Sequence, residues 1–106
     1  MLDDRDNDED KRWARAVKTA GNFQCALCSA KDVYLESHHK NAYNSFPEQR
    51  TLLSNGISLC SYHHNQFHHI YGKGNNTEDQ FKQYEETYKA LRKLAEKQLK
   101  ESKEEK

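Results

Sequence analysis

The chain has little apolar material, and what it lacks limits the ways in which it can fold. Of its 106 residues, 34% are hydrophobic and 32% are charged, so the sequence cannot build a large apolar core. A chain of this length forms at most one small domain, and such domains usually add disulfides, a metal ion or a partner chain. The sequence has only three cysteines, and an odd number argues against a closed set of disulfides.

The sequence also lacks a long hydrophobic run and an excess of charge of either sign. No segment approaches the length of a membrane span, and the first residues, MLDDRDNDEDKR, are acidic, unlike the basic start of a secretory signal. We therefore expect no membrane association and a reducing, cytoplasmic location, where clustered cysteines more often bind metal than form crosslinks. The formal net charge is zero, so the whole chain carries no electrostatic signal for nucleic acid.

Hydropathy patterning divides the chain into three regions. Residues 1–10 are a charged, acidic leader that we expect to be flexible. Residues 11–81 form one domain that begins with a helix, and residues 82–106 extend a second, long helix into a charged tail. In the first helix, apolar residues recur at helical spacing before Gly21, namely Trp13, Ala14, Ala16, Val17 and Ala20.

The middle of the chain predicts two short strands followed by a helix. The segments VYLES (33–37) and GISLC (56–60) are rich in β-forming residues. Residues 40–55 are polar and contain the only proline, which predicts a loop with at most a helical turn. The next segment predicts a helix that Ser61 caps and Gly72 ends.

A long helix is predicted near the C-terminus. Thr77 precedes Gln80 by three residues, the spacing of a capping box. Apolar residues then recur every three or four positions on one face, namely Phe81, Tyr84, Tyr88, Leu91 and Ala95. We expect this face to dock on the domain of a monomer, with dimerisation through a coiled-coil seam on this helix as the alternative.

Two short motifs predict a structural zinc site. Cys25 and Cys28 are separated by two residues in CALC, and Cys60 and His63 repeat that spacing in CSYH. Together they offer four nitrogen and sulfur ligands, the tetrahedral set of a closed structural zinc. The alternative is that the cysteines are buried apolar thiols and that His63 is a surface residue. The paired spacing, in a chain short of core, favours zinc.

The other five histidines suggest a second site. His64 and His68 are four residues apart and share one face of the predicted helix, whereas His69 points elsewhere. His38 and His39 end the first strand, where side chains alternate, so one can bind a metal while the other is available for another role. A histidine site without cysteine suits a hydrolytic divalent ion, and the alternative is a set of polar surface histidines.

The order of these motifs resembles the HNH endonucleases. A strand ending in SHHK, Asn55 in SNGISLC, and a helix with two histidines are similar to the ββα-metal fold of that family. The zinc-bearing, phage-type branch surrounds its ββα unit with two C-x2-C motifs, and FHHIYGKGNNTEDQF looks like that branch. The resemblance covers about residues 23–81. It implies a small α+β fold, with a ββα-metal core and a structural zinc flanked by N-terminal and C-terminal helices.

The resemblance also implies a role for each matched residue. His39 would be the general base, and Asn55 would orient its ring. His38, His64 and His68 would hold a catalytic divalent cation, which we expect to be Mg²⁺, Mn²⁺, Ni²⁺, Co²⁺ or Zn²⁺. The chain departs from the family where His38 replaces the usual Asp. It departs again where a histidine replaces the fourth cysteine of the zinc site.

The resemblance implies a metal-dependent DNA endonuclease that hydrolyses phosphodiester bonds, in the cytoplasm of a bacterium or of a phage-infected cell. Arg50, Lys40 and Lys73 are the expected DNA contacts, and a partner protein, such as phage packaging machinery, would supply specificity. The alternative is a zinc-stabilised, non-catalytic module that binds nucleic acid or protein, which the balanced charge favours. A redox role for CALC would need a βαβ context that the sequence does not offer.

Overall fold

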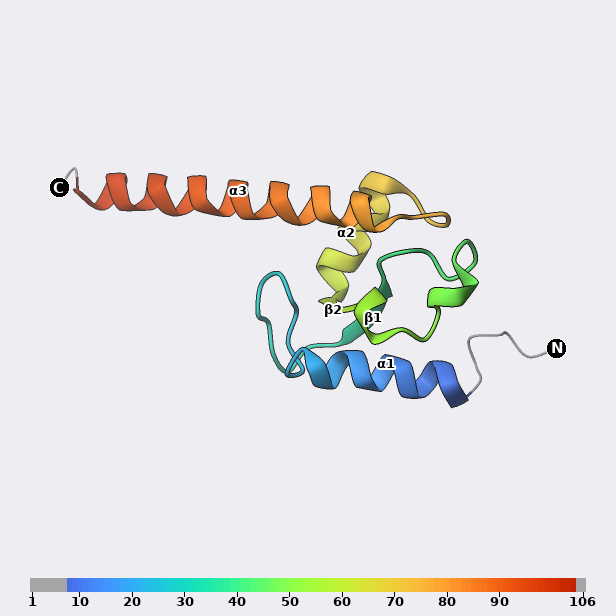
Figure 1. Cartoon of the computed structure of the whole chain (residues 1–106). Helices are drawn as coiled ribbons and strands as arrows, with labels where there is room; N and C mark the ends of the chain where they lie inside the picture. The colour runs from blue at the N-terminus through green and yellow to red at the C-terminus, as the bar shows by residue number, and fades with distance from the viewer. Residues whose placement is uncertain (1–7, 105–106) are drawn as a thin grey trace.

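A short antiparallel sheet lies between helices on both of its faces (Figure 1). The computed structural model describes residues 8–104, which form a small α+β fold. In chain order, its helices and strands are α1 (Asp8–Ala20), β1 (Leu35–His39), β2 (Gly56–Cys60), α2 (Ser61–Tyr71) and α3 (Glu78–Glu104). Two 3₁₀ turns, Pro47–Gln49 and Leu53–Asn55, interrupt the loop between the strands.

Alternate residues of the sheet face two different helices. β1 and β2 are antiparallel, and their register pairs Leu35 with Cys60 and His39 with Gly56. Ser37 donates a hydrogen bond to the Ala14 carbonyl of α1, which therefore covers the face that also carries His39. The residues on the other face, Glu36 and His38, contact α2. The prediction that His38 and His39 face opposite ways is confirmed.

Helix α1 begins earlier than the sequence predicts. It starts at Asp8, so residues 8–10 of the expected flexible leader are helical, and residues 1–7 lie outside the described part of the chain. Asp10 is buried and accepts a hydrogen bond of 2.7 Å from the Tyr43 hydroxyl. Trp13 and Val17 form the rest of the buried face of this helix. The helix begins earlier than expected because Asp10, in its first turn, has a buried hydrogen-bond partner, Tyr43, in the loop between the strands.

Two local predictions in the middle of the chain were wrong. β1 begins at Leu35, two residues after the expected start, because Val33 and Tyr34 are exposed and do not join the sheet. Ser61 does not cap α2; the N-cap is Cys60, which keeps the extended backbone of β2, and its side chain makes no capping hydrogen bond. The predicted helix end is confirmed, since Gly72 has a positive φ of 81° and its N–H bonds to the His68 carbonyl.

Helix α3 docks only with its first turns. The predicted capping box forms, because the Gln80 N–H bonds to the Thr77 hydroxyl and the Gln80 side chain accepts from the Thr77 N–H. Phe81 and Tyr84 are buried and contact Phe67 of α2.

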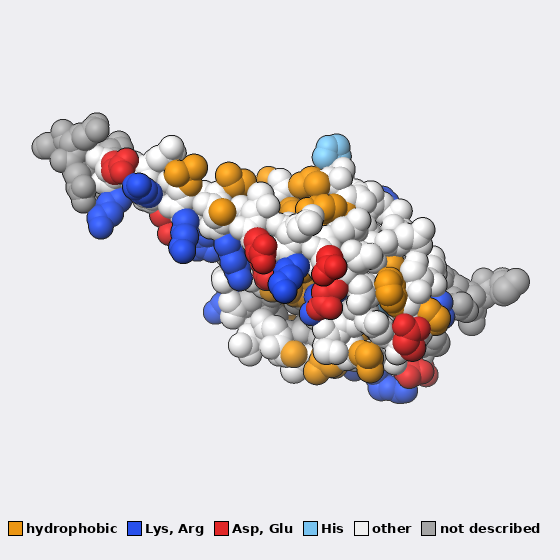
Figure 2. Space-filling model, turned by 45° about the horizontal axis from the view of Figure 1, so that its top comes forward, with side chains coloured by type: hydrophobic (Ala, Val, Ile, Leu, Met, Phe, Trp, Pro, Cys, Tyr) orange, Lys and Arg blue, Asp and Glu red, His pale blue; other side chains and the backbone are white. Residues whose placement is uncertain are grey.

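Beyond these turns, α3 projects away from the domain (Figure 1). Leu91 is 61% exposed and Ala95 is exposed, so the prediction that they dock with the rest of the stripe was wrong. The domain is too small to lie under a helix of 27 residues, whose length is about 40 Å. Figure 2 shows hydrophobic side chains among the charged ones on this projecting part. No helix within residues 8–104 is long and apolar enough to cross a membrane.

The core is small, as the composition predicts. Only Phe67, Leu59 and Cys25 have fully buried large side chains among the residues described. The cluster around them is completed by a few residues of the loop, the sheet and α3, namely Leu27, Leu35, Cys60, Phe81 and Tyr84. Because two of these core residues are cysteines, the chemistry of the thiols is part of the stability of the fold.

Candidate metal centres and the histidine pocket

The three cysteines and His63 meet at one point beside the core. Their ligand atoms all lie within 4.8 Å of one another, and the Cys60 Sγ and Cys25 Sγ lie 3.3 and 3.7 Å from the His63 Nδ1. The Cys28 Sγ lies 4.0 Å from the Cys60 Sγ. Ligands of a tetrahedral zinc, at about 2.0–2.3 Å from the ion, are roughly 3.4–3.8 Å apart. This group can therefore hold a metal ion such as zinc, as the sequence predicts.

Backbone hydrogen bonds bring the two halves of this group together. Cys25 and Cys28 lie in a turn that closes with the Ser29 N–H on the Cys25 carbonyl, and the Ala26 N–H bonds to the Ser58 carbonyl of β2. Cys60 and His63 come from the junction of β2 and α2. The sheet thus positions a turn from one side and a helix start from the other.

The environment of these ligands affects their protonation. Burial raises the pKa of the Cys25 thiol, but backbone hydrogen bonds from Cys60, Cys28 and Leu27 outweigh it, so the pKa is lowered overall. Burial, together with the neighbouring thiols, raises the pKa of Cys28. Burial lowers the pKa of His63 and so favours the neutral imidazole that binds zinc.

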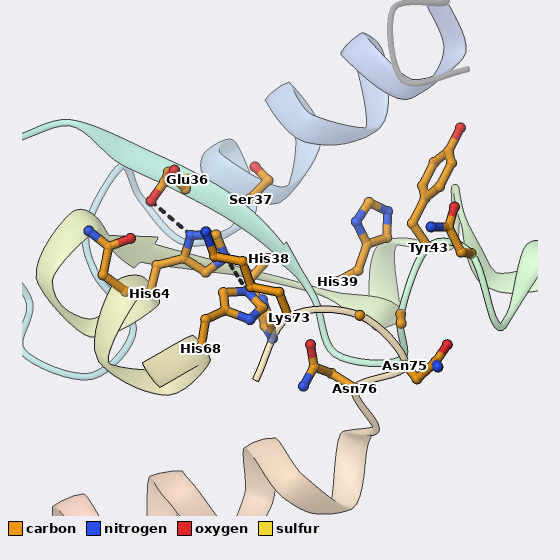
Figure 3. Close-up of a pocket in the computed structure, with 14 residues that line it drawn as sticks. Glu36, Ser37, His38, His39, Tyr43, His64, His68, Lys73, Asn75 and Asn76 are labelled. Carbon is orange, nitrogen blue, oxygen red and sulfur yellow. Dashed lines mark hydrogen bonds and ion pairs between the residues drawn. The ribbon is translucent and has the colours of Figure 1, made fainter. Parts of the chain in front are cut away.

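A second group consists of His38, His64 and His68, whose ligand atoms also lie within 4.8 Å of one another. Figure 3 shows these rings gathered at one end of the pocket, with β1 supplying His38 and α2 the other two. The ring centroids of His64 and His68 lie 5.1 and 5.4 Å from that of His38. His69 is exposed on α2 and is not part of the group, as predicted.

The hydrogen bonds of this group leave its Nε2 atoms facing one another. The His64 Nδ1 bonds to the Glu36 carboxylate at 2.8 Å, and the His68 Nδ1 bonds to the Gly72 carbonyl at 3.0 Å. Both partners are acceptors, so each neutral ring carries its proton on Nδ1 and its lone pair on Nε2. The two Nε2 atoms nevertheless lie only 3.1 Å apart. Two lone pairs at that distance repel each other unless a proton or a metal cation lies between them.

His38 adds a third ring nitrogen to this group. Its side chain is 3% exposed, and its buried Nε2 has no hydrogen-bond partner within residues 8–104. Burial, and then the charges of His64 and His68, lower the pKa of His38 to about 3, so this ring is neutral at pH 7. A buried polar atom without a partner is costly, and a bound cation would satisfy it. The donor set therefore fits a divalent ion held by three neutral imidazoles.

Glu36 is a further residue of the histidine group that no sequence motif indicates. It lies on the same face of β1 as His38 and contacts a histidine 28 positions later in the chain. A carboxylate that accepts the distal N–H of a metal-binding histidine fixes the ring and raises the basicity of its other nitrogen. The alternation of β1 could have placed Glu36 beside His38, but no local pattern links it to α2.

We expect Glu36→Gln to weaken divalent metal binding at the histidine group by about 10- to 100-fold, because the neutral amide is a weaker acceptor for the His64 Nδ1–H. Titration calorimetry of the zinc-loaded protein with Ni²⁺ or Co²⁺ measures this affinity. Glu86→Gln, on the exposed face of α3, is the matched control and should bind like the wild type. Equal affinity in the two variants would show that Glu36 does not support the site.

His39 borders the same cavity from the other side of β1. The cavity has a volume of about 360 Å³, and its lining includes His38, His39, His64, His68, Tyr43 and Lys73 (Figure 3). The His39 Nε2 lies 2.9 Å from the Arg50 carbonyl, which can only accept, so the ring donates from Nε2. The lone pair of the neutral ring is therefore on Nδ1.

Asn55 does not contact the His39 ring as expected. Its Oδ1 accepts from the Asn41 N–H, and its Nδ2 donates to the carbonyls of Asn41 and Gln49. Asn55 instead holds the loop whose next carbonyl, that of Arg50, receives the His39 N–H. The expected direct orientation of His39 is therefore corrected to an indirect one, in which a buried amide positions the acceptor.

The three expected DNA-binding residues occupy different environments. Lys73 lines the cavity. Arg50 donates to the Tyr43 carbonyl at 2.7 Å, and its guanidinium lies 4.2 Å from the centre of the Tyr43 ring. Lys40 forms an ion pair of 3.4 Å with Glu78. Arg50 and Lys40 thus contact other parts of the fold, and Lys73 is the basic side chain best placed for a ligand in the cavity.

Comparisons of the chain with protein-family models, with curated proteins and with solved structures find no match. Function is therefore inferred from the side chains of the site.

Proposed function

We propose that the protein is a metal-dependent endonuclease that hydrolyses phosphodiester bonds in DNA by the mechanism of the HNH family. The observation that carries the proposal is the pair of Nε2 atoms of His64 and His68, 3.1 Å apart, beside the unpartnered Nε2 of His38. A fourth histidine, His39, whose ring donates from Nε2, borders the same cavity. The order of two antiparallel strands and a ligand-bearing helix further supports this assignment.

The charges of the cavity favour an anionic substrate. His38, His64 and His68 are neutral ligands, so a bound divalent cation would keep its full charge. Lys73 and Glu36 add one positive and one negative charge to the lining, so the cavity would be positive with the ion bound. Such an ion would stabilise the negative charge that develops on a phosphodiester during hydrolysis. Lys73 would bind a phosphate oxygen as a point charge. DNA, as a chain of phosphodiesters, presents this anion at every step.

His39 is the general base in this proposal. Because its Nε2–H is held by the Arg50 carbonyl, its Nδ1 can accept a proton from a water molecule. The water oxygen then bonds to phosphorus, and the bond from phosphorus to a sugar oxygen breaks. Asn55 contributes by holding the loop that carries the Arg50 carbonyl.

The second candidate is a zinc-stabilised module that binds nucleic acid or protein without cleavage. The zero net charge and the internal contacts of Arg50 and Lys40 favour it, because two of the three expected DNA contacts are engaged within the fold. The two candidates differ in metal content. The module needs the metal of the Cys3His group alone, and the nuclease needs a second, exchangeable ion.

Plasmid cleavage tests the proposal. Zinc-loaded protein should nick or linearise supercoiled DNA only when Mg²⁺, Mn²⁺, Ni²⁺, Co²⁺ or further Zn²⁺ is added. His68→Ala removes a metal ligand and should lower the rate by at least about 100-fold. His69→Ala changes the adjacent, exposed histidine of the same helix and should cleave like the wild type. Folded wild-type protein that binds one zinc and cleaves with none of these ions would favour the binding module.

A further inference from the structure

Helix α1 packs against one side of the His39 ring through Trp13. The indole of Trp13 lies flat against the imidazole, with ring centroids 3.8 Å apart and an angle of 13° between the planes. Trp13 is 6% exposed, and its Nε1–H donates to the Leu52 carbonyl at 2.8 Å. The indole is therefore itself fixed, by burial and by a hydrogen bond to the loop between the strands.

Three contacts define the plane of the His39 ring. The face of Trp13 covers one side of the ring. The Tyr43 ring meets it edge-on, with 5.4 Å between the ring centroids, and the Arg50 carbonyl accepts a hydrogen bond from Nε2. Rotation of the imidazole about its Cβ–Cγ bond would break the hydrogen bond and the stacking together. The stacking is thus coupled to the tautomer that leaves the lone pair on Nδ1.

Gly56 makes this close approach feasible. It pairs with His39 across the sheet, under the indole. A Cβ at this position would lie 2.3 Å from the Val17 Cγ2 and 2.8 Å from the Trp13 Cζ2, both closer than atoms can pack. The absence of a side chain on the neighbouring strand therefore lets α1 bring its only aromatic ring onto the histidine.

We propose that Trp13 is a positioning residue for His39, an inference that depends on the proposed function. Its flat face holds the imidazole in the plane where Nε2 donates to the Arg50 carbonyl, which places the lone pair on Nδ1, the atom proposed as the base. Leucine, an aliphatic side chain close in size to phenylalanine, would pack at this position without defining the plane of the ring. Helix α1, which lies outside the ββα unit, thus contributes one side chain, Trp13, that positions the proposed base.

Two substitutions of Trp13 separate the flat face from the packing. Trp13→Phe keeps an aromatic face, and we expect kcat within about threefold of the wild type, whereas Trp13→Leu should lower kcat on the order of 10- to 100-fold with KM little changed. Val17→Ala, on the same buried face of α1, is the control for lost packing and should keep the wild-type kcat where it is folded. Gly56→Ala displaces the indole without changing it and should also lower kcat.

A measurement that does not need cleavage follows the ring itself. Long-range ¹H–¹⁵N spectra distinguish the two neutral tautomers of His39; the wild type should show Nε2–H, and Trp13→Leu should show a mixture. An unchanged tautomer in folded Trp13→Leu would overturn the inference, even if the wild type cleaves no DNA. A kcat for Trp13→Leu equal to that of a cleaving wild type would also overturn it. In contrast, a loss of cleavage in His39→Ala would support the proposed function and would not test the role of Trp13.

Discussion

Cys28→Ser is expected to unfold the domain at room temperature, as is removal of the ion from the Cys3His group by a chelator. The free energy of a structural zinc site at neutral pH is on the order of 10 kcal/mol. The whole stability of a small domain is about 5–15 kcal/mol, so the loss is comparable to the total. Cys28 is the half-buried cysteine of the group, and serine there removes a ligand with little change in packing.

Circular dichroism and thermal melts, with zinc content measured in parallel, would check this expectation. The wild type should contain one tightly held zinc, and Cys28→Ser should have lost both the zinc and the cooperative transition. His68→Ala, which removes a ligand of the other group, should keep both. A chelated protein that still melted within a few degrees of the wild type would show that the apolar core alone is sufficient.

His39→Ala is expected to lower the rate of DNA cleavage by about 10²–10⁴-fold, the usual contribution of a positioned general base. The metal ligands should be unaffected, because His39 lies on the opposite face of β1 from His38. Steady-state cleavage of a labelled duplex under saturating metal measures the rate. Calorimetry should find the same affinity for the second ion as in the wild type.

The control for this substitution is His69→Ala, which removes an exposed histidine outside the cavity and keeps the base itself. If His39→Ala cleaved at the wild-type rate while His68→Ala did not, the ion would be required and the base would have to be another group. If neither variant differed from an active wild type, the histidine pocket would not be the site of cleavage.

Local patterns were enough to predict the ligand pairs within each group. The spacing of Cys25 with Cys28, and of Cys60 with His63, needs only a tight turn and one helical turn, and the structure brings all four together. The pairing of His64 with His68 follows from the pitch of a helix. The capping box of α3 and the end of α2 at Gly72 are local in the same way. These features depend on residues that are at most four positions apart.

Other features depended on contacts between distant parts of the chain. Glu36 meets α2, Trp13 meets the end of β1, and the Arg50 carbonyl takes the hydrogen bond that was expected of Asn55. The exposure of Leu91 likewise depends on how far the domain extends beneath α3.

The sequence by itself therefore determined which residues can bind metal and which helix and strands carry them, because those relations are set by backbone geometry over a few residues. Tertiary structure alone decided what surrounds each imidazole. The protonation, orientation and basicity of a ring depend on its partners in space, and those partners come from distant segments, as Glu36 does for His64, 28 positions later.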